Sequence, residues 1–246
     1  KEVVTDIQNK LEFKKPNVFR KSFERKNLSY VVRHSEDKLG ELVNILNSVP
    51  GTAIVYVRSR KATQSIAQVL IDNDINASHF HAGLKYEEKI QKQNDWKQNT
   101  CRVIVSTNAF GMGIDKPDVR SVIHMDLPNS MEEYYQEAGR AGRDGKKSYA
   151  VILWNKQDTT NLKRRITDSF PSKEHILRVY ECLANYYQIA AGSGAGLVLD
   201  FNLFDFCNNF RLSTLQTHHA LKILALAEYI EYTDEIDNRS RLKFRV

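Results

Sequence analysis

Short apolar segments alternate with amphipathic stretches from Leu28 to Ile166, and this alternation limits the folds open to the chain more than any other feature. Between the segments, apolar residues recur every three or four positions, for example in Ser59–Leu70, which predicts helices. Strands that alternate with helices predict an α/β fold, a parallel sheet with helices on both faces, which binds ligands at the carboxyl ends of its strands. The segments are rich in Val, Ile and Tyr, as buried strands are; they are Leu28–Val32, Ala53–Val57, Val103–Ser106, Val122–Met125 and Tyr149–Leu153.

The pattern changes near Pro171, and we divide the 246 residues into three parts. Residues 1–27 are basic and are interpreted as a connector from an upstream segment, and residues 28–170 form the α/β part. In residues 171–246, a helical connector with Ser172 as its cap precedes a glycine-rich break. Two helices, the second capped by Ser213, and two strands around a polar loop then predict a small winged-helix-like domain.

The winged-helix pattern has two interpretations, since small helix–helix–hairpin units also occur as packing modules without DNA contacts. The last predicted strand and its flanks favour DNA binding, because they carry four basic residues and no acid: Arg239, Arg241, Lys243 and Arg245.

Positive charge is concentrated in one part of the sequence. The net charge is +6, and the stretch from Gly139 to Arg178 holds ten Lys or Arg against four acids. Such clustering indicates a polyanionic partner, a nucleotide or a nucleic acid, although a solvated helix face has the same composition. No apolar run approaches the roughly 18 residues that span a bilayer, and residues 1–6 have no apolar signal-peptide core. We therefore expect no membrane partner and a cytoplasmic, nucleoid-associated location.

The spacing of the cysteines does not predict a metal-binding site. Cys101, Cys182 and Cys207 are far apart in the sequence and form no CxxC pair. A structural zinc site needs four closely spaced ligands. We therefore expect small buried side chains at these positions, no zinc and no other metal site in this chain.

The string QEAGRAGRDG, residues 136–145, is the most informative part of the sequence. Arg140 and Arg143 are three residues apart and project from nearly one face of a helix. The glycines around them leave room for a close ligand, and guanidinium groups match phosphate oxygens with paired donors. On its own the string is equally compatible with a turn that carries two solvated arginines.

A second string, residues 105–118, makes the simple turn a poor explanation. A predicted buried strand leads here into a loop whose Ser106 and Thr107 hydroxyls can donate to phosphate. Gly111 and Gly113 permit unusual backbone angles. Asp115 offers a carboxylate that can accept from a ribose hydroxyl.

Together the two strings resemble motifs V and VI of superfamily 2 helicases, in the form typical of the RecQ family. Other segments strengthen the resemblance, which extends over roughly Val4 to Leu153. Residues 23–28 are similar to the connector between the two helicase lobes, and residues 52–60 to motif IV. Residues 79–84 resemble the family's short signature after a strand, and residues 122–128 continue motif V. The resemblance implies a RecA-like second lobe of an ATP-driven, 3′ to 5′ DNA helicase.

The resemblance also implies roles for individual residues. Arg143 matches the arginine finger that reaches the γ-phosphate from across the cleft between lobes, and Arg140 matches its partner on the nucleotide. Gln136 matches a position that couples nucleotide to DNA, and Asp115 matches the motif V acid near the ribose. The residues that match the surface gripping the DNA strand are Ser59, Arg60, His81, Ser106 and Thr107.

Two departures from the family pattern matter. RecQ helicases usually carry a four-cysteine zinc module after motif VI, whereas only Cys182 and Cys207 follow it here, so this chain resembles a divergent branch. The chain also has no G-x-x-x-x-G-K-[ST] loop, since Gly145-Lys146 is followed by Lys147. We therefore expect ATP and Mg²⁺ to be held mainly by a first lobe outside this sequence, which is itself a partner.

The expected nucleic-acid partner is DNA, as a single strand and at duplex junctions. An RNA helicase of the same superfamily is the alternative enzyme, but those typically carry His-Arg where this chain has Gln136-Glu137. The alternative from another class is a nucleic-acid-binding module without catalysis, which describes the chain when it is isolated from the first lobe.

Overall fold

The computed structural model describes residues 2–15, 17–19, 22, 24–111, 114–190, 193–233 and 241–244. The N-terminal helix α1 (Glu2–Lys10) precedes an alternating series of strands and helices. This series is β1 (Leu28–His34), α2 (Lys38–Ser48), β2 (Thr52–Tyr56), α3 (Arg60–Asp72), β3 (Ala77–Phe80), α4 (Tyr86–Lys97), β4 (Val103–Ser106), β5 (Val119–His124), α5 (Met131–Ala138) and β6 (Ser148–Trp154). Among the helices of the described part of the chain, none has the length and apolar character needed to cross a membrane.

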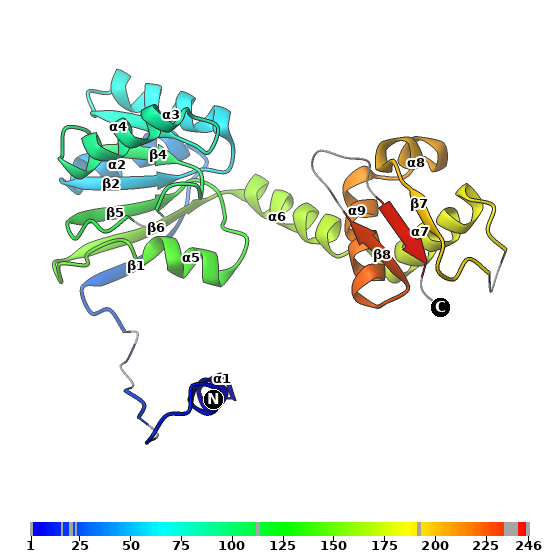
Figure 1. Ribbon diagram of the computed structural model, residues 1–246. Helices are drawn as coiled ribbons and strands as arrows, with labels where there is room; N and C mark the ends of the chain where they lie inside the picture. Colours follow the sequence, from blue (N-terminus) through cyan, green and yellow to red (C-terminus); the bar gives the residue numbers. More distant parts are fainter. Residues whose placement is uncertain are drawn as a thin grey trace. The chain divides into compact units, whose positions relative to one another are not determined.

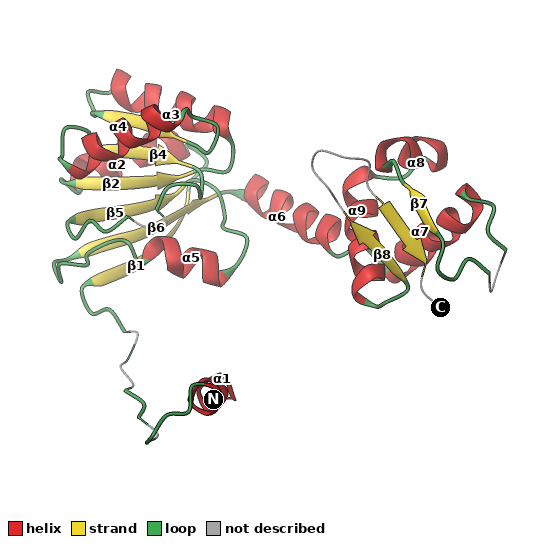
Figure 2. Ribbon diagram, viewed as in Figure 1, coloured by secondary structure: helices red, strands yellow, loops and turns green. Residues whose placement is uncertain are grey.

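Six strands form one sheet in the order β1-β6-β5-β2-β4-β3, with helices packed against it (Figures 1 and 2). Strand β4 pairs in parallel with both β2 and β3, so that Ser106 lies level with Tyr56 and with Phe80. Every residue of β2 and β4 is buried, which explains why these strands are continuous apolar runs rather than alternating ones. The predicted α/β fold with a RecA-like parallel sheet is confirmed.

The sequence located most elements within a few residues of their observed bounds. It did not list strand β3 (Ala77–Phe80), whose polar Ser78 and His79 interrupt the apolar run. It also did not list α6 (Lys156–Ser169), the helix that precedes the predicted connector helix α7 (Lys173–Tyr186). The predicted cap Ser172 is correct, since its hydroxyl accepts from the His175 backbone N–H at 3.3 Å.

A second core lies beyond α6. It is built from α7, β7 (Val198–Asp200), α8 (Leu203–Phe210), α9 (Thr214–Leu226), β8 (Ile230–Thr233) and β9 (Arg241–Phe244). The three strands pair in the antiparallel order β7-β9-β8. Val179, Leu183, Phe206 and Leu221 are fully buried in one apolar cluster with residues of β7, β8 and their flanks. The two predicted helices and the hairpin are present, and β7 adds a third strand that the sequence pattern did not indicate.

The role of this region in DNA binding stays a prediction. Helix α9 would be the recognition helix of a winged helix, but it packs against α6, α7, α8 and β8, and Lys222 is its only Lys or Arg. Of the four basic residues that favoured DNA binding, Arg239 and Arg245 lie outside the described residues.

The chain divides into two compact units whose limits do not follow the predicted domains. One comprises residues 1–31, 43–123 and 135–151, and the other residues 32–42, 124–134 and 152–246. The boundaries expected at residues 28 and 171 therefore remain a proposal.

Candidate nucleotide and nucleic-acid site

Three of the predicted site segments meet at one edge of the sheet. Because β2, β4 and β3 run parallel and in register, their carboxyl ends lie side by side. Ser59 and Arg60 follow β2, Thr107 follows β4, and His81 follows β3. The backbone joins two of these segments directly, since the Thr107 N–H donates to the Phe80 carbonyl at 3.4 Å. Residues far apart in the sequence are thus brought together where such sheets bind ligands.

An aromatic cluster packs against the loop that follows β4. Phe110 is buried, and its ring makes edge-to-face contacts with Phe80 at 4.8 Å and Trp96 at 5.2 Å between centroids. The Tyr56 hydroxyl, at the end of β2, donates to the Phe110 carbonyl at 3.0 Å. Burial raises the pKa of Tyr56, which keeps this donor protonated. These contacts fix the backbone that leads into Gly111.

Arg140 crosses over Gly111, so the two predicted strings are in contact. Its guanidinium donates to the Gly111 carbonyl. Gly111 has φ of +129°, and a Cβ at this position would lie 2.2 Å from the Arg140 Cζ atom. Only glycine provides both the backbone angle and the space. The Arg140 guanidinium also lies near the Tyr56 hydroxyl, where its charge and hydrogen bonding oppose the effect of burial on the pKa of Tyr56.

Arg143 pairs with Asp115, the other predicted contact between the strings. The Arg143 Nη1 atom lies 2.7 Å from the Asp115 Oδ1 atom, and the two side chains are 37% and 83% exposed. Ion pairs this exposed contribute little to stability, about 0–1 kcal/mol. The guanidinium is therefore oriented by a partner that it can exchange for a phosphate at small cost.

Two residues of the segment before β1 hold the loop that carries Arg140 and Arg143, which we call the arginine loop. The Arg25 Nη2 atom donates to the carbonyls of Ala141, at 3.0 Å, and Gly142, at 2.6 Å. The Asn27 side chain donates to Gly142, at 2.7 Å, and to Lys146, at 2.9 Å. The sequence marked residues 23–28 only as a connector; Phe23 lies outside the described residues.

A contact between Arg120 and Asp144 also holds the arginine loop, and the sequence did not predict it. Arg120, on β5, donates to both carboxylate oxygens of Asp144 at 2.7 Å, and this hydrogen bonding lowers the pKa of Asp144. The Asp144 N–H in turn donates to the Pro117 carbonyl at 3.1 Å. Paired Arg and Asp residues 24 positions apart give no local signal in a sequence.

The residues predicted to grip a strand have different surroundings. Arg60 is exposed, and a Cβ on Gly83 would lie 3.0 Å from its Nη1 atom and 3.4 Å from the His81 Nδ1 atom, so both side chains lie beside Gly83. His81 is only 8% exposed, and its Nδ1 atom has no partner among the described residues. Thr107 is half-buried. These three residues follow the carboxyl ends of β2, β3 and β4, and their contact with a bound strand stays a prediction.

Two of the residues predicted to contact DNA, Ser106 and Ser59, make hydrogen bonds within the protein, and their contact with DNA stays a prediction. Ser106 is completely buried, and its hydroxyl donates to backbone carbonyls, at 3.0 Å to Phe80 and 2.7 Å to Thr107. The prediction that Ser106 touches a bound strand is therefore not supported by its position. Ser59 is exposed, but its hydroxyl caps α3 by accepting from the Ala62 N–H at 3.0 Å. Its local role is to start the helix that carries Arg60.

Gln136 lies on the exposed side of α5, in the same helix as the buried Glu137. Its predicted role in coupling nucleotide to DNA stays a prediction. Gly113, the second glycine predicted to give the motif V loop unusual angles, lies outside the described residues.

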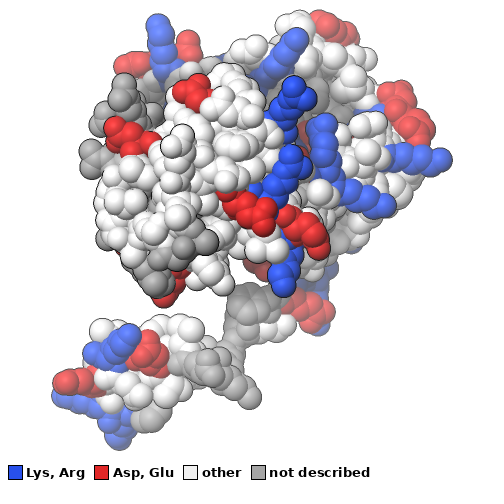
Figure 3. Space-filling view, turned by 90° about the vertical axis from the view of Figure 1, so that its right-hand side faces the viewer, with Lys and Arg blue, Asp and Glu red and all other residues white. Residues whose placement is uncertain are grey.

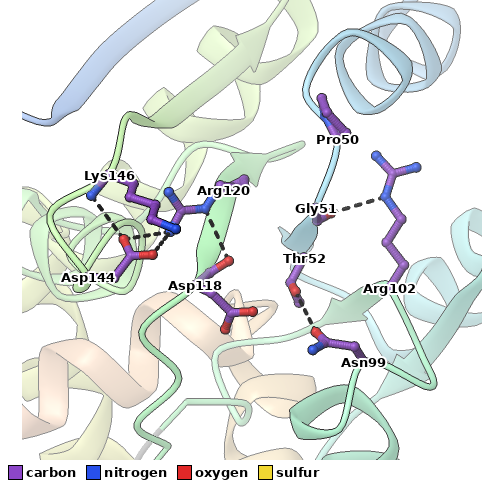
Figure 4. A pocket seen from close by; sticks show the side chains of 9 residues that line it. All are labelled: Pro50, Gly51, Thr52, Asn99, Arg102, Asp118, Arg120, Asp144 and Lys146. Carbon is purple, nitrogen blue, oxygen red and sulfur yellow. Dashed lines mark hydrogen bonds and ion pairs between the residues drawn. The ribbon is translucent and has the colours of Figure 1, made fainter.

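A cavity of about 600 Å³ opens at the opposite ends of the strands, where β2, β4 and β5 begin (Figure 4). Its arginines are already engaged by the protein: Arg102 donates to the Gly51 carbonyl at 3.0 Å, and Arg120 to Asp144. The lining residues are Pro50, Gly51, Thr52, Asn99, Arg102, Asp118, Arg120, Asp144 and Lys146. Of the two strings, this lining contains Asp118 and Asp144, but it contains none of the predicted site residues.

The three cysteines are buried free thiols, and Cys182 and Cys207 belong to the same apolar cluster. Burial raises the pKa of Cys101 to about 11 and also raises that of Cys182. Within the residues that the structure describes, no three His, Cys, Asp or Glu side chains gather as metal ligands would.

We accordingly expect the purified protein to contain no zinc, because zinc is bound by thiolates and these thiols are buried in apolar surroundings. Elemental analysis of tag-free, chelator-washed protein should give far less than one zinc per chain. A stoichiometric zinc signal would contradict the interpretation of the cysteines.

Comparison with known proteins identifies the domain. Residues 36–145 match the family described as "Helicase conserved C-terminal domain". The chain is 41% identical over 171 residues to the RecQ-like DNA helicase blm-1 of Caenorhabditis elegans, which covers 68% of this chain and 17% of that protein. It is 33% identical over 253 residues to the ATP-dependent helicase SGS1 of Saccharomyces cerevisiae, covering 94% of this chain and 17% of SGS1.

Another relative is named as an RNA helicase rather than a DNA helicase. A putative ATP-dependent RNA helicase, R290 of Acanthamoeba polyphaga mimivirus, is 41% identical over 169 residues, or 68% of this chain and 31% of that protein. The chain therefore spans less than a third of the length of each of these three relatives.

The fold has a counterpart among solved structures. In a crystal structure of the E. coli DEAD-box protein SrmB bound to regulator of ribonuclease activity A, the matching chain has a TM-score of 0.51 and 25% identity. The match covers 58% of this chain and 88% of that one. The relatives, the matched domain and the contacts of Arg140 and Arg143 with the first string agree, and the chain belongs to the RecQ-like helicases of superfamily 2, of which it contains the C-terminal helicase domain.

Proposed function

We propose that this chain is the second motor lobe of an ATP-dependent 3′ to 5′ DNA helicase and that it supplies the arginine finger. The observation that carries the proposal is the exposed Arg143–Asp115 pair beside the Arg140–Gly111 contact. Each guanidinium contacts the loop of residues 111–115, and each has donors that suit a polyphosphate.

The residues present fit part of an ATP site. Arg143 and Arg140 would bind phosphate oxygens, and Asp115 would release Arg143 to accept from the ribose. Mg²⁺ would be held mainly by the other lobe, since no trio of metal-binding side chains occurs among the described residues. When bound, the metal neutralises charge on the β- and γ-phosphates. The task of this chain is to bring a guanidinium to the transferred phosphoryl group and to withdraw it when the lobes separate.

Nucleic acid would pass along the edge formed by the ends of β2, β3 and β4. Arg60 would pair with a phosphate, and Thr107 and His81 would donate to the same backbone. Ser59 would act through the start of α3, by orienting Arg60. We propose DNA as the partner, as a single strand and at duplex junctions, and a first RecA-like lobe as the protein partner that completes the motor.

One relative named as a putative RNA helicase supports a second candidate, an RNA helicase. Gln136-Glu137 argues for DNA, because the resemblance places His-Arg at these positions in RNA helicases. Stimulation of ATP hydrolysis by DNA and RNA of the same sequence would separate the two candidates.

The 246-residue chain alone should hydrolyse no ATP above background, with or without DNA, because it contains no phosphate-binding G-x-x-x-x-G-K-[ST] loop. A longer protein that joins it to a lobe with such a loop should show DNA-stimulated hydrolysis. Steady-state phosphate release measures both. Activity of the isolated chain that disappears in an Arg143→Ala variant would belong to the chain itself and contradict the proposal.

A further inference from the structure

Helix α6 is anchored along one side only. In its first turn, the Asp158 carboxylate accepts from the Lys38 Nζ atom at 2.9 and 3.1 Å, and both side chains are largely buried. Two turns later, Arg165 donates to the Asn129 side chain at 2.9 Å and to the Leu127 carbonyl at 3.2 Å. Near its end, Asp168 accepts from Gln216 of α9 at 2.9 Å. These contacts fix the orientation of the helix about its own axis.

The opposite side of α6 is exposed and basic. At about 100° per residue, Lys156, Thr160, Lys163 and Thr167 fall within about 60° of one another, with Arg164 next to them. All five side chains are exposed. Asp158 and Arg165 point about 180° away from the centre of this group. We call these five residues the basic face of α6.

Neither carboxylate of α6 lies on this face. The only carboxylates of α6 are Asp158 and Asp168, and both are engaged on the anchored side. Among the residues that the structure describes, none forms an ion pair with Lys156, Lys163 or Arg164. Figure 3 shows a band of Lys and Arg side chains on one side of the surface, with some Asp and Glu side chains among them. A fixed, one-sided array of cations attracts a polyanion more strongly than the same charges on a mobile segment.

We propose that the basic face of α6 binds the phosphate backbone of double-stranded DNA. Lys156 and Lys163 are about 10 Å apart along the helix axis, a length that corresponds to about three phosphates of one strand. The hydroxyls of Thr160 and Thr167 lie beside the cations but donate within the helix, to the carbonyls of Lys156 at 3.2 Å and Lys163 at 3.1 Å, so the cations would carry the contact. Single strands are held largely by stacking on aromatic rings, and α6 contains no aromatic residue, which favours a duplex. This inference rests on the proposed function and extends its DNA-binding surface beyond the helicase motifs.

The test compares two triple variants of the full-length protein. Lys156→Gln, Lys163→Gln and Arg164→Gln together remove the charges of the basic face and keep every anchor of α6. The matched control, Lys85→Gln, Lys89→Gln and Lys97→Gln, removes equal charge at α4. Fluorescence anisotropy gives the affinity for a blunt duplex and for a single strand at several salt concentrations, and the melting temperature should be unchanged in both variants.

The basic-face variant should bind the duplex on the order of 10- to 100-fold more weakly at low salt, and the salt slope should fall by about 2 to 3, since each lost phosphate contact removes about 0.9. The control should change much less. Unchanged duplex affinity and slope, an equal loss in the control, or an equal loss on single strands would each overturn the inference. A wild-type protein that binds no DNA in either form would instead overturn the proposed function, and this inference with it.

Discussion

Replacement of Arg143 by alanine should lower the ATP turnover of the full-length helicase by on the order of 10³-fold or more, about 4 kcal/mol of transition-state stabilisation. Charge builds on the equatorial oxygens of the transferred phosphoryl group, and a guanidinium that enters from the second lobe stabilises it. The Arg143 guanidinium already has an acidic partner, Asp115, at 2.7 Å, and a phosphate would replace this partner when the lobes close.

Lysine should substitute poorly at position 143, because it lacks the paired donors of arginine. ATP affinity should fall less than turnover, since the other lobe would provide most of the contacts to bound ATP. Steady-state hydrolysis, ATP binding and melting temperature are measured for Arg143→Ala and Arg143→Lys. If Arg143 only anchors a turn, its removal would lower the melting temperature and leave turnover per folded molecule nearly normal, and that result would end the assignment.

The second large effect is expected from Gly111→Ala, which should lower turnover on the order of 100-fold. The new Cβ would lie 2.2 Å from the Cζ and 2.5 Å from the Nε atom of Arg140, so the guanidinium must move aside. A displacement of about 1 Å near a reacting group can cost that much. The backbone angle adds strain of about 1–3 kcal/mol, which should also lower the melting temperature.

The variant Gly145→Ala separates the effect of displacing the Arg140 guanidinium from the effect of backbone strain. Gly145 also has a positive φ, +79°, but no atom lies within 4 Å of its would-be Cβ. This control should therefore lose stability and keep most of its turnover. In addition, the double variant Gly111→Ala/Arg140→Ala should be no slower than Arg140→Ala alone, because both changes remove the same guanidinium contact. Fully additive effects would show that Gly111 acts by another route.

Much of the α/β part could be predicted because its signals are local. The buried strands β2 and β4 are continuous apolar runs, and Ser172 starts α7 with its side chain alone. Strand β3 was harder, since Ser78 and His79 interrupt its apolar character. The three residues of β7 are exposed or half-buried, and the strand is defined by its antiparallel pairing with β9 rather than by its own side chains.

The candidate site was predictable as a set of residues but not as a set of contacts. The two strings that carry Arg140, Arg143 and Asp115 are specific enough to identify, and the structure brings them together. The burial of Ser106 could not be inferred, because its hydroxyl is satisfied by the carbonyl of Phe80 on a neighbouring strand. Contacts such as Arg120–Asp144 depend on tertiary structure, and neither partner stands out in the sequence.

The hydrogen bonds of Arg25 and Asn27 to the arginine loop have a consequence for exchanging lobes between related helicases. A lobe cut to begin at Leu28 would keep all six strands of the sheet, yet it would lose the donors that hold the carbonyls of Ala141 and Gly142. A chimera joined at that point would keep the sheet, but the residues at positions 25 and 27 that contact the loop of Arg143 would come from the other helicase. Two related helicases should therefore be joined upstream of Arg25, so that Arg25 and Asn27 are transferred together with the loop that they support.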